Sequence, residues 1–246
     1  MIDIFRSEWT KIRSVRSTVW TLAVTAVLMT GLSALINAAA ENAATGPVPA
    51  DQAIAMSLAG TMLASLSMAT LGVLAISSEY RTGGIRTSLI AVPRRMRLLT
   101  AKIVVFVAIS LVVCAVASAA AVGVGLAISR PPSIEMGEVM RSTLGAALYL
   151  TACGLLGLGL GTLVRHTPGA IMSAIALILV LPTVAGQLPG GWGRTVAEYF
   201  TTNAGSLIVS GQDNGSLGPW SGFAVYLVWV AVVVIAGAVL MQRRDA

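Results

Sequence analysis

The chain has 246 residues, of which 56% are hydrophobic and only 11% are charged. A soluble globular domain carries about 25% charged residues, so this composition, with a mean hydropathy of +0.86, excludes that class and predicts an integral membrane protein. The net charge of +6 matches the excess of Lys and Arg that membrane proteins place in their inner loops. We therefore expect the protein to lie in a lipid bilayer and not to bind nucleic acid.

The first 17 residues alternate apolar and basic side chains at close to helical spacing. This pattern predicts an amphipathic helix lying on the inner leaflet, and an ordinary polar overhang is the alternative. The apolar run that follows, over about 18–40, is longer than the roughly 7–15 residues of a signal-peptide core. We interpret it as a retained membrane span.

Six apolar runs are each long enough to cross a hydrocarbon core about 30 Å thick as a helix. The short alternating segments of a membrane β-barrel are absent from the sequence. We expect an all-α membrane fold that forms one transmembrane domain over residues 1–246. The predicted spans are about 18–40, 53–78, 101–128, 142–164, 169–188 and 219–241.

The basic residues are distributed unevenly between the loops. If both termini are cytoplasmic, 13 of the 16 Lys and Arg residues lie inside, and only Arg130, Arg141 and Arg194 lie outside. Such an asymmetry across short loops sets the orientation of a membrane protein. The sequence predicts a multi-pass protein of the cell membrane with both ends in the cytoplasm.

Two further features concern packing at and between the spans. Residues 189–218 contain "VAEYFTTNAGSLIV", which fits short helices that dip back into the membrane edge or a loop that lies on its surface. In the fourth span, Gly154, Gly157 and Gly161 provide the small-residue spacing that lets helices approach closely. We expect this spacing to serve packing within the chain.

The predicted spans contain almost no ionisable side chains, so the sequence offers no proton or ion path. The lone His166 is expected to be solvated or hydrogen-bonded, and Cys114 and Cys153 to be buried hydrophobes without a role. No GxxxxGK[ST] phosphate loop is present. We expect no catalytic, metal or cofactor-binding residues in this chain and no ATP hydrolysis by it alone.

A charged inner loop, "SSEYRTGGIRTSLIAVPRRMRLLTAK" at residues 77–102, lies between the second and third predicted spans. Its two glycines permit a sharp turn, and the alternation around Ile85 and Leu89 predicts a short amphipathic helix on the membrane surface. A hinge with positive-inside anchors is the alternative. That alternative explains the later basic residues but not why Glu79, Tyr80 and the two glycines precede an exposed helix.

The order of these features resembles the membrane subunits of ABC-2-type transporters. Four features match the coupling loop of that family: the acidic Glu79, the pair Gly84–Ile85, the proline followed by basic residues at Pro93–Arg94–Arg95, and Lys102. Gly83 departs from the family pattern. The resemblance implies that a cytoplasmic coupling helix between spans 2 and 3 contacts an ATPase. The residues implied in this contact are Glu79, Tyr80, Arg81, Thr82, Gly83, Gly84, Ile85 and Arg86.

The same resemblance implies a permease subunit of an exporter or flippase for a hydrophobic or amphipathic substrate. It implies separate ABC ATPase subunits that bind ATP and Mg, and a second permease subunit that is identical or different. A non-conducting membrane anchor or regulatory subunit for a cytoplasmic ATPase is the alternative. An intramembrane enzyme is disfavoured because the sequence has no catalytic constellation.

Overall fold

The computed structural model describes residues 16–43, 46–81 and 95–243, and every regular element within them is helical. The elements are α2 (Arg16–Ala43), α3 (Ala50–Ser57), α4 (Thr61–Arg81), α6 (Arg95–Ser129), α7 (Met136–Val164), α8 (Thr167–Ile175), the π-helix η1 (Ala176–Val180), α9 (Leu181–Ala185), α10 (Gly190–Tyr199), α11 (Thr201–Gly205), α12 (Leu207–Ser210) and α13 (Pro219–Arg243). The predicted amphipathic helix over residues 1–17 lies outside the described residues, apart from its last two positions.

The described residues contain six helical stretches that are long and apolar enough to cross a membrane, which confirms the predicted number of spans. They are Ser17–Ala43, Ala50–Ser78, Met96–Ser129, Met136–Val164, Thr167–Ala185 and Pro219–Arg243. The third and fourth begin several residues earlier than predicted, and the fifth ends earlier.

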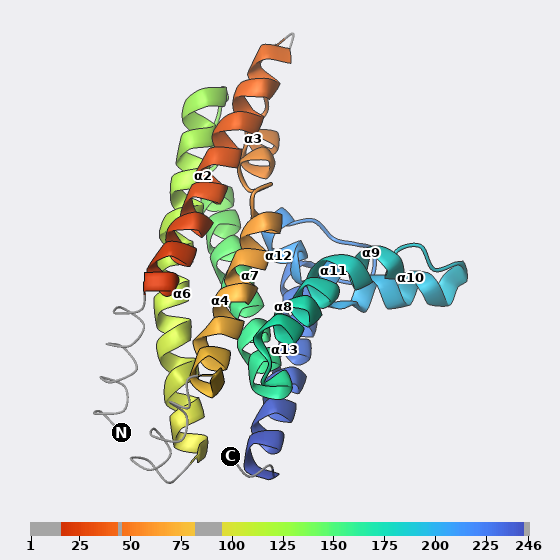
Figure 1. The fold of residues 1–246 in the computed structure, drawn as a ribbon. Coiled ribbons are helices and arrows are strands. Elements are labelled where there is room, and N and C mark those ends of the chain that lie inside the picture. The colour runs from red at the N-terminus through yellow and green to blue at the C-terminus, as the bar shows by residue number, and fades with distance from the viewer. Residues whose placement is uncertain (1–15, 44–45, 82–94, 244–246) are drawn as a thin grey trace.

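The fourth span, α7, is the centre of the bundle (Figure 1). Of its most apolar stretch, 78% is buried within the chain, against 17% for α2. Small residues let α4 lie directly against it: a Cβ at Gly157 would overlap the Ala69 carbonyl, and one at Gly72 would overlap the Gly154 carbonyl. The glycine spacing in the fourth span therefore serves close packing within the chain, as predicted.

The second span, predicted as one helical run, consists of two helices in the structure. The chain breaks at residues 58–60, between α3 and α4. The backbone N–H and the hydroxyl of Thr61 both donate to the Leu58 carbonyl, at 2.9 and 2.7 Å, and so begin a new helix. Gly60 fits against α2, where an added Cβ would lie 3.1 Å from the Leu28 carbonyl oxygen. The break turns α3 towards α2 and α6.

The fifth span contains a π-helical segment that hydropathy did not predict. The Leu181 N–H donates to the carbonyl of Ala176, five residues back, and Pro182 has no N–H to continue the ladder. The carbonyls of Leu177 and Ile178 consequently lose their regular helical donors. They accept instead from the hydroxyls of Thr201 and Thr202, each at 2.9 Å.

Residues 189–218, for which sequence left two arrangements open, form short helices beside the spans. Ile208 in α12 lies so close to α7 that a Cβ at Gly145 would overlap its carbonyl, and Ala204 in α11 is similarly close to Gly222 of α13. Trp229 donates its indole N–H to the Tyr199 carbonyl at 3.1 Å, about 15 Å along α13 from its start. This segment therefore packs against the flanks of the spans and does not lie across their ends.

Candidate coupling site

The loop between α4 and α6 is the candidate site. The structure describes the end of α4, where the loop begins, and the start of α6, where it ends. The backbone of Glu79, Tyr80 and Arg81 forms the last turn of α4. The remaining predicted contact residues, Thr82–Arg86, lie outside the described residues, as does the predicted coupling helix. The spans on either side of the loop are held to each other and to their neighbours by contacts near this end of the bundle.

Lys102 fastens the start of α6 to the end of α4. Its side chain is only 4% exposed, and Nζ donates to the Ala75 carbonyl at 3.3 Å. Ala75 lies one helical turn before Glu79. Because an ammonium group is costly to bury without partners, this contact favours a fixed distance between the two ends of the loop. Arg97, five residues earlier, is exposed and fits the role of a simple positive-inside anchor.

The turn between α7 and α8 ties the same end of the bundle to two further helices. Thr167 donates its hydroxyl to Ser77 of α4 at 3.0 Å. The Arg165 guanidinium reaches the Leu240 carbonyl in the last turns of α13 at 3.4 Å, where a cation also complements the helix dipole. His166 caps α8 by accepting the Gly169 N–H at 3.3 Å, so this histidine is hydrogen-bonded as expected.

These contacts make the end of α4 a junction. Its last two turns are bound to α6 through Lys102 and to α8 through Ser77. About 13–18 Å before its end, the same helix lies against α7 at the glycine seam, which we define as Gly72, Gly154 and Gly157 with the Ala69 backbone. α4 is therefore in direct contact with three other spans. The arrangement suits mechanical transmission. No group of His, Cys, Asp or Glu residues within the described ranges could hold a metal ion.

A buried polar cluster joins α2, α3 and α6 far from this junction, and sequence analysis assigned it no role. Asn37, which is fully buried, donates to the Ser33 carbonyl at 2.9 Å and to the Ser57 hydroxyl at 3.2 Å. Its carbonyl oxygen accepts from Ser129 at 2.8 Å. The sequence signal for this cluster is an amide side chain inside an apolar span. Its three partners lie in separate helices, so the sequence alone does not show that they meet.

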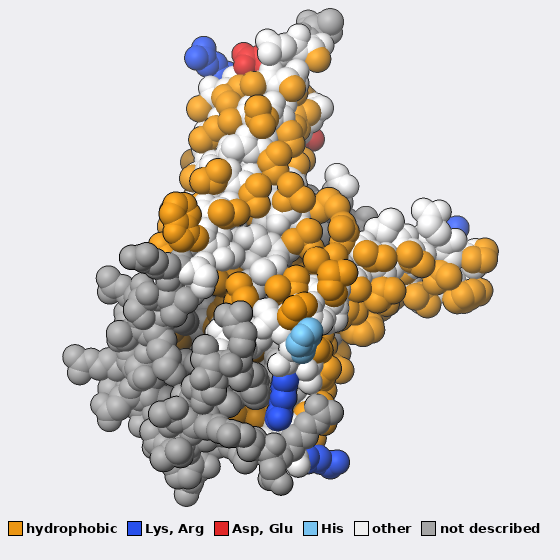
Figure 2. Space-filling model, in the orientation of Figure 1, with side chains coloured by type: hydrophobic (Ala, Val, Ile, Leu, Met, Phe, Trp, Pro, Cys, Tyr) orange, Lys and Arg blue, Asp and Glu red, His pale blue; other side chains and the backbone are white. Residues whose placement is uncertain are grey.

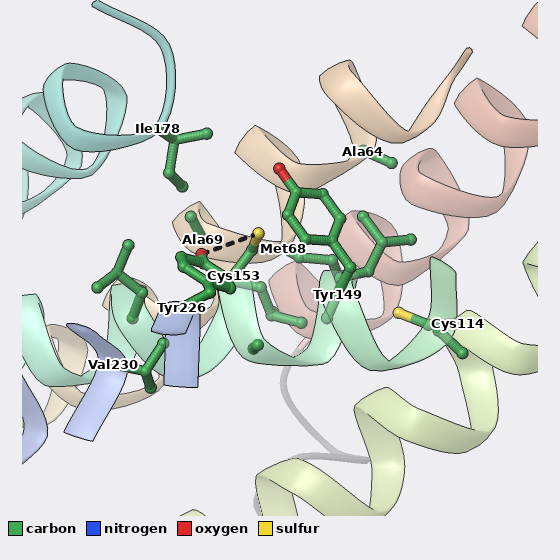
Figure 3. Packing of buried hydrophobic residues seen from close by; sticks show 14 of the residues in the cluster. Ala64, Met68, Ala69, Cys114, Tyr149, Cys153, Ile178, Tyr226 and Val230 are labelled. Atoms are coloured by element: carbon green, nitrogen blue, oxygen red, sulfur yellow. Dashed lines mark hydrogen bonds between the residues drawn. The ribbon is translucent and has the colours of Figure 1, made fainter. Parts of the chain in front are cut away.

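The two cysteines lie in the core, as expected (Figure 3). Tyr226 of α13 donates its hydroxyl to the Cys153 sulfur at 3.1 Å, and its ring lies 5.8 Å from that of Tyr149. These contacts join α7 to α13. Figure 3 also shows Cys114, from α6, near the same core.

A family model described as ABC-2 family transporter protein matches residues 4–186, which is well over half of the chain. The chain belongs to this family. Among curated proteins, none matches it in sequence. The predicted resemblance is thereby confirmed, and the chain is a transmembrane ABC-2 permease.

In this ABC-2 permease the family match includes the whole α4–α6 loop and both of its bases. It ends just after α9, so α10–α13 lie beyond it. The later part is nevertheless integral to the fold, since α13 packs on α7 and α11 completes the fifth span.

Proposed function

We propose that the chain is the permease subunit of an ABC exporter or flippase, driven by separate ATPase subunits that bind ATP and Mg. A second permease subunit, identical or different, completes the transporter. Both termini lie in the cytoplasm and the chain resides in the cell membrane. The observation that carries this proposal is the junction at the end of α4 together with the glycine seam, through which the helix that enters the cytoplasmic loop is tied to three other spans.

The coupling step follows from this junction. Residues Glu79–Arg86 contact the ATPase, and closure of the ATPase displaces the last turn of α4. Because the glycine seam leaves no space between α4 and α7, the two helices move together. A partner shifts a two-state assembly only through contacts that differ between the states. Lys102 and Thr167 carry the displacement to α6 and to the fifth span.

The nature of the exposed faces supports a hydrophobic or amphipathic substrate. Figure 2 shows hydrophobic side chains over most of the visible bundle, with charged side chains at its two ends and at the tip of the lateral projection. Large apolar side chains are exposed along α2 and α13, including Trp20, Val27, Val228 and Ile235. A path formed between two such subunits is apolar. It offers no polar groups that would replace the water around an ion, so it favours a hydrophobic substrate.

Reconstitution tests the proposal. The chain is copurified with its ATPase, placed in liposomes, and assayed for ATP-dependent movement of fluorescent phospholipids and hydrophobic dyes between leaflets or into the lumen. We expect movement that needs both chains and ATP, and no hydrolysis by the purified chain alone. A complex that hydrolyses ATP but moves none of these probes contradicts the proposal and supports the non-conducting anchor.

Orientation is tested separately by labelling intact cells with a membrane-impermeant thiol reagent. The native cysteines are buried, so the unmodified chain is the blank. We expect Thr45→Cys and Ser216→Cys to react from outside and Ser88→Cys not to react. External labelling of the Ser88 position contradicts the proposed cytoplasmic termini.

A further inference from the structure

Helix α10 carries an exposed apolar face. Trp192, Val196 and Tyr199 are 63%, 40% and 41% exposed. Their spacing of four and three residues places them on one side of an α-helix. A large apolar face of this kind on an otherwise polar segment marks a surface that is covered in the native environment.

The opposite side of α10 is polar and faces a cavity. Its residues Gly190, Arg194, Ala197 and Glu198 line a pocket of about 510 Å³ together with Asn203 and other groups of the same segment. A helix turns by about 100° per residue, so the mean direction of these four positions is roughly opposite to that of Trp192, Val196 and Tyr199. Figure 2 shows the same division, with hydrophobic side chains along one edge of the lateral projection and a basic side chain at the other.

The bonds that hold α10 in place come mainly from its polar side. Asn203 donates to the Ala197 carbonyl at 3.0 Å and also to the Pro182 carbonyl at 3.2 Å. Ser216 donates to the Glu198 carboxylate at 2.6 Å. At the start, Gly190 adopts φ +81° and Gly193 packs against Leu188, which folds α10 back beside α9. The apolar face is therefore presented in a fixed direction.

α10 packs beside α9, the last part of the fifth span. Leu181 and Val184 of α9 are 40% and 54% exposed. α9 and α10 project together from the side of the bundle (Figure 1). Since the fifth span crosses the bilayer, lipid is the neighbour that covers both surfaces continuously.

We propose that α10 is an interfacial anchor whose face of Trp192, Val196 and Tyr199 inserts at the boundary between the headgroups and acyl chains of the outer leaflet. The amphipathic rings of Trp and Tyr favour this depth, and the polar side with Arg194 and Glu198 faces water. Assignment to the outer leaflet rests on the proposed orientation. Through Asn203, the anchor fixes the outer end of the fifth span.

The test uses single cysteines on the two faces of the same helix. Trp192→Cys and Val196→Cys probe the apolar face. Arg194→Cys and Gly191→Cys are the matched controls, because both positions are exposed and a Cβ at Gly191 meets nothing within 4 Å. Each variant is labelled with an impermeant maleimide in intact cells, and the total thiol is measured after denaturation.

We expect the two control positions to label and the two apolar positions to lose most of their labelling. A fluorophore attached at position 196 in proteoliposomes is expected to be quenched by brominated phospholipids. Equal labelling at all four positions overturns the proposal. Disulfide crosslinking of the Val196→Cys variant to a second copy, without quenching by lipid, also overturns it. Neither measurement involves transport, so failure of the transport proposal leaves this inference standing. Control positions that do not label in intact cells would contradict the proposed orientation and, with it, the assignment to the outer leaflet.

Discussion

The Thr202 hydroxyl donates a 2.9 Å hydrogen bond to the carbonyl of Ile178, the group that Pro182 leaves without a regular helical donor. Thr201 does the same for Leu177. The fifth span is thus completed by side chains that come from a different segment. The segment of residues 189–218 is a structural part of the span, and disturbing either affects both.

This relationship predicts that Thr202→Val destabilises the protein. Valine keeps the shape but removes the donor, and an unsatisfied buried carbonyl costs about 1–3 kcal/mol. We expect a lower midpoint of thermal unfolding in detergent. Thr183→Val is the control, because that exposed hydroxyl bonds within its own helix and its loss should change the midpoint little.

Pro182→Ala provides a second arm of the same experiment. It restores an N–H near the orphaned carbonyls, so Thr202→Val should cost less in that background than in the wild type. A double-mutant cycle measures the difference. Equal costs in the two backgrounds would show that the threonine does not compensate for the proline.

Asn37→Leu is expected to loosen the contact between α2, α3 and α6. The substitution leaves Ser129 without its acceptor and removes a donor to Ser57, so the stability loss should again be about 1–3 kcal/mol. Leu35→Ala is the control on the same helix, since Leu35 is 69% exposed. Similar unfolding midpoints for both variants would contradict a stabilising role for the cluster.

Gly157→Ala is expected to separate α4 from α7. Its added methyl group would overlap the Ala69 carbonyl, whereas one at Gly123 meets nothing within 4 Å. Overpacking of this kind costs about 1–3 kcal/mol. Gly123→Ala should instead be neutral or stabilising by up to about 1 kcal/mol. Thermal unfolding of the two variants, which add the same atoms, measures the effect of the seam alone.

The coupling proposal predicts that Glu79→Ala and Arg86→Ala weaken ATPase binding or uncouple hydrolysis from transport. Truncating one partner of an interfacial charge pair costs about 2–5 kcal/mol. Arg95→Ala and Arg97→Ala are the controls, because many residues share the positive-inside role. Binding, hydrolysis and transport are measured with the copurified ATPase. If all four variants behave alike, the loop is only a topological anchor.

Substitution of Lys102 is expected to have a different effect from substitution of the nearby Arg97. Lys102→Met removes a buried link between α6 and α4, so we expect reduced transport per ATP hydrolysed with ATPase binding retained. Arg97→Met should leave both quantities near the wild type, since Arg97 is exposed. Loss of ATPase binding in the Lys102 variant would place this lysine in the contact surface and contradict its role as an internal link.

The sequence predicted the six spans because hydrophobicity and length are local properties of each segment. The break at Gly60 and the π-helix before Pro182 were missed, because each depends on a distant partner, α2 in one case and Thr201 in the other. Charge alone could not distinguish buried Lys102 from exposed Arg97 either. The difference is positional: Lys102 lies just over one helical turn after Arg97 and faces the Ala75 carbonyl of α4.

The completion of the fifth span by Thr201 and Thr202 also orders the biogenesis of the protein. These hydroxyls lie 24 residues after the carbonyls that they satisfy, so they leave the ribosome later than the span that they complete. Until the later segment emerges, Leu177 and Ile178 present polar backbone to lipid or to the insertion machinery. The two carbonyls of the fifth span therefore gain their donors only when α11 docks.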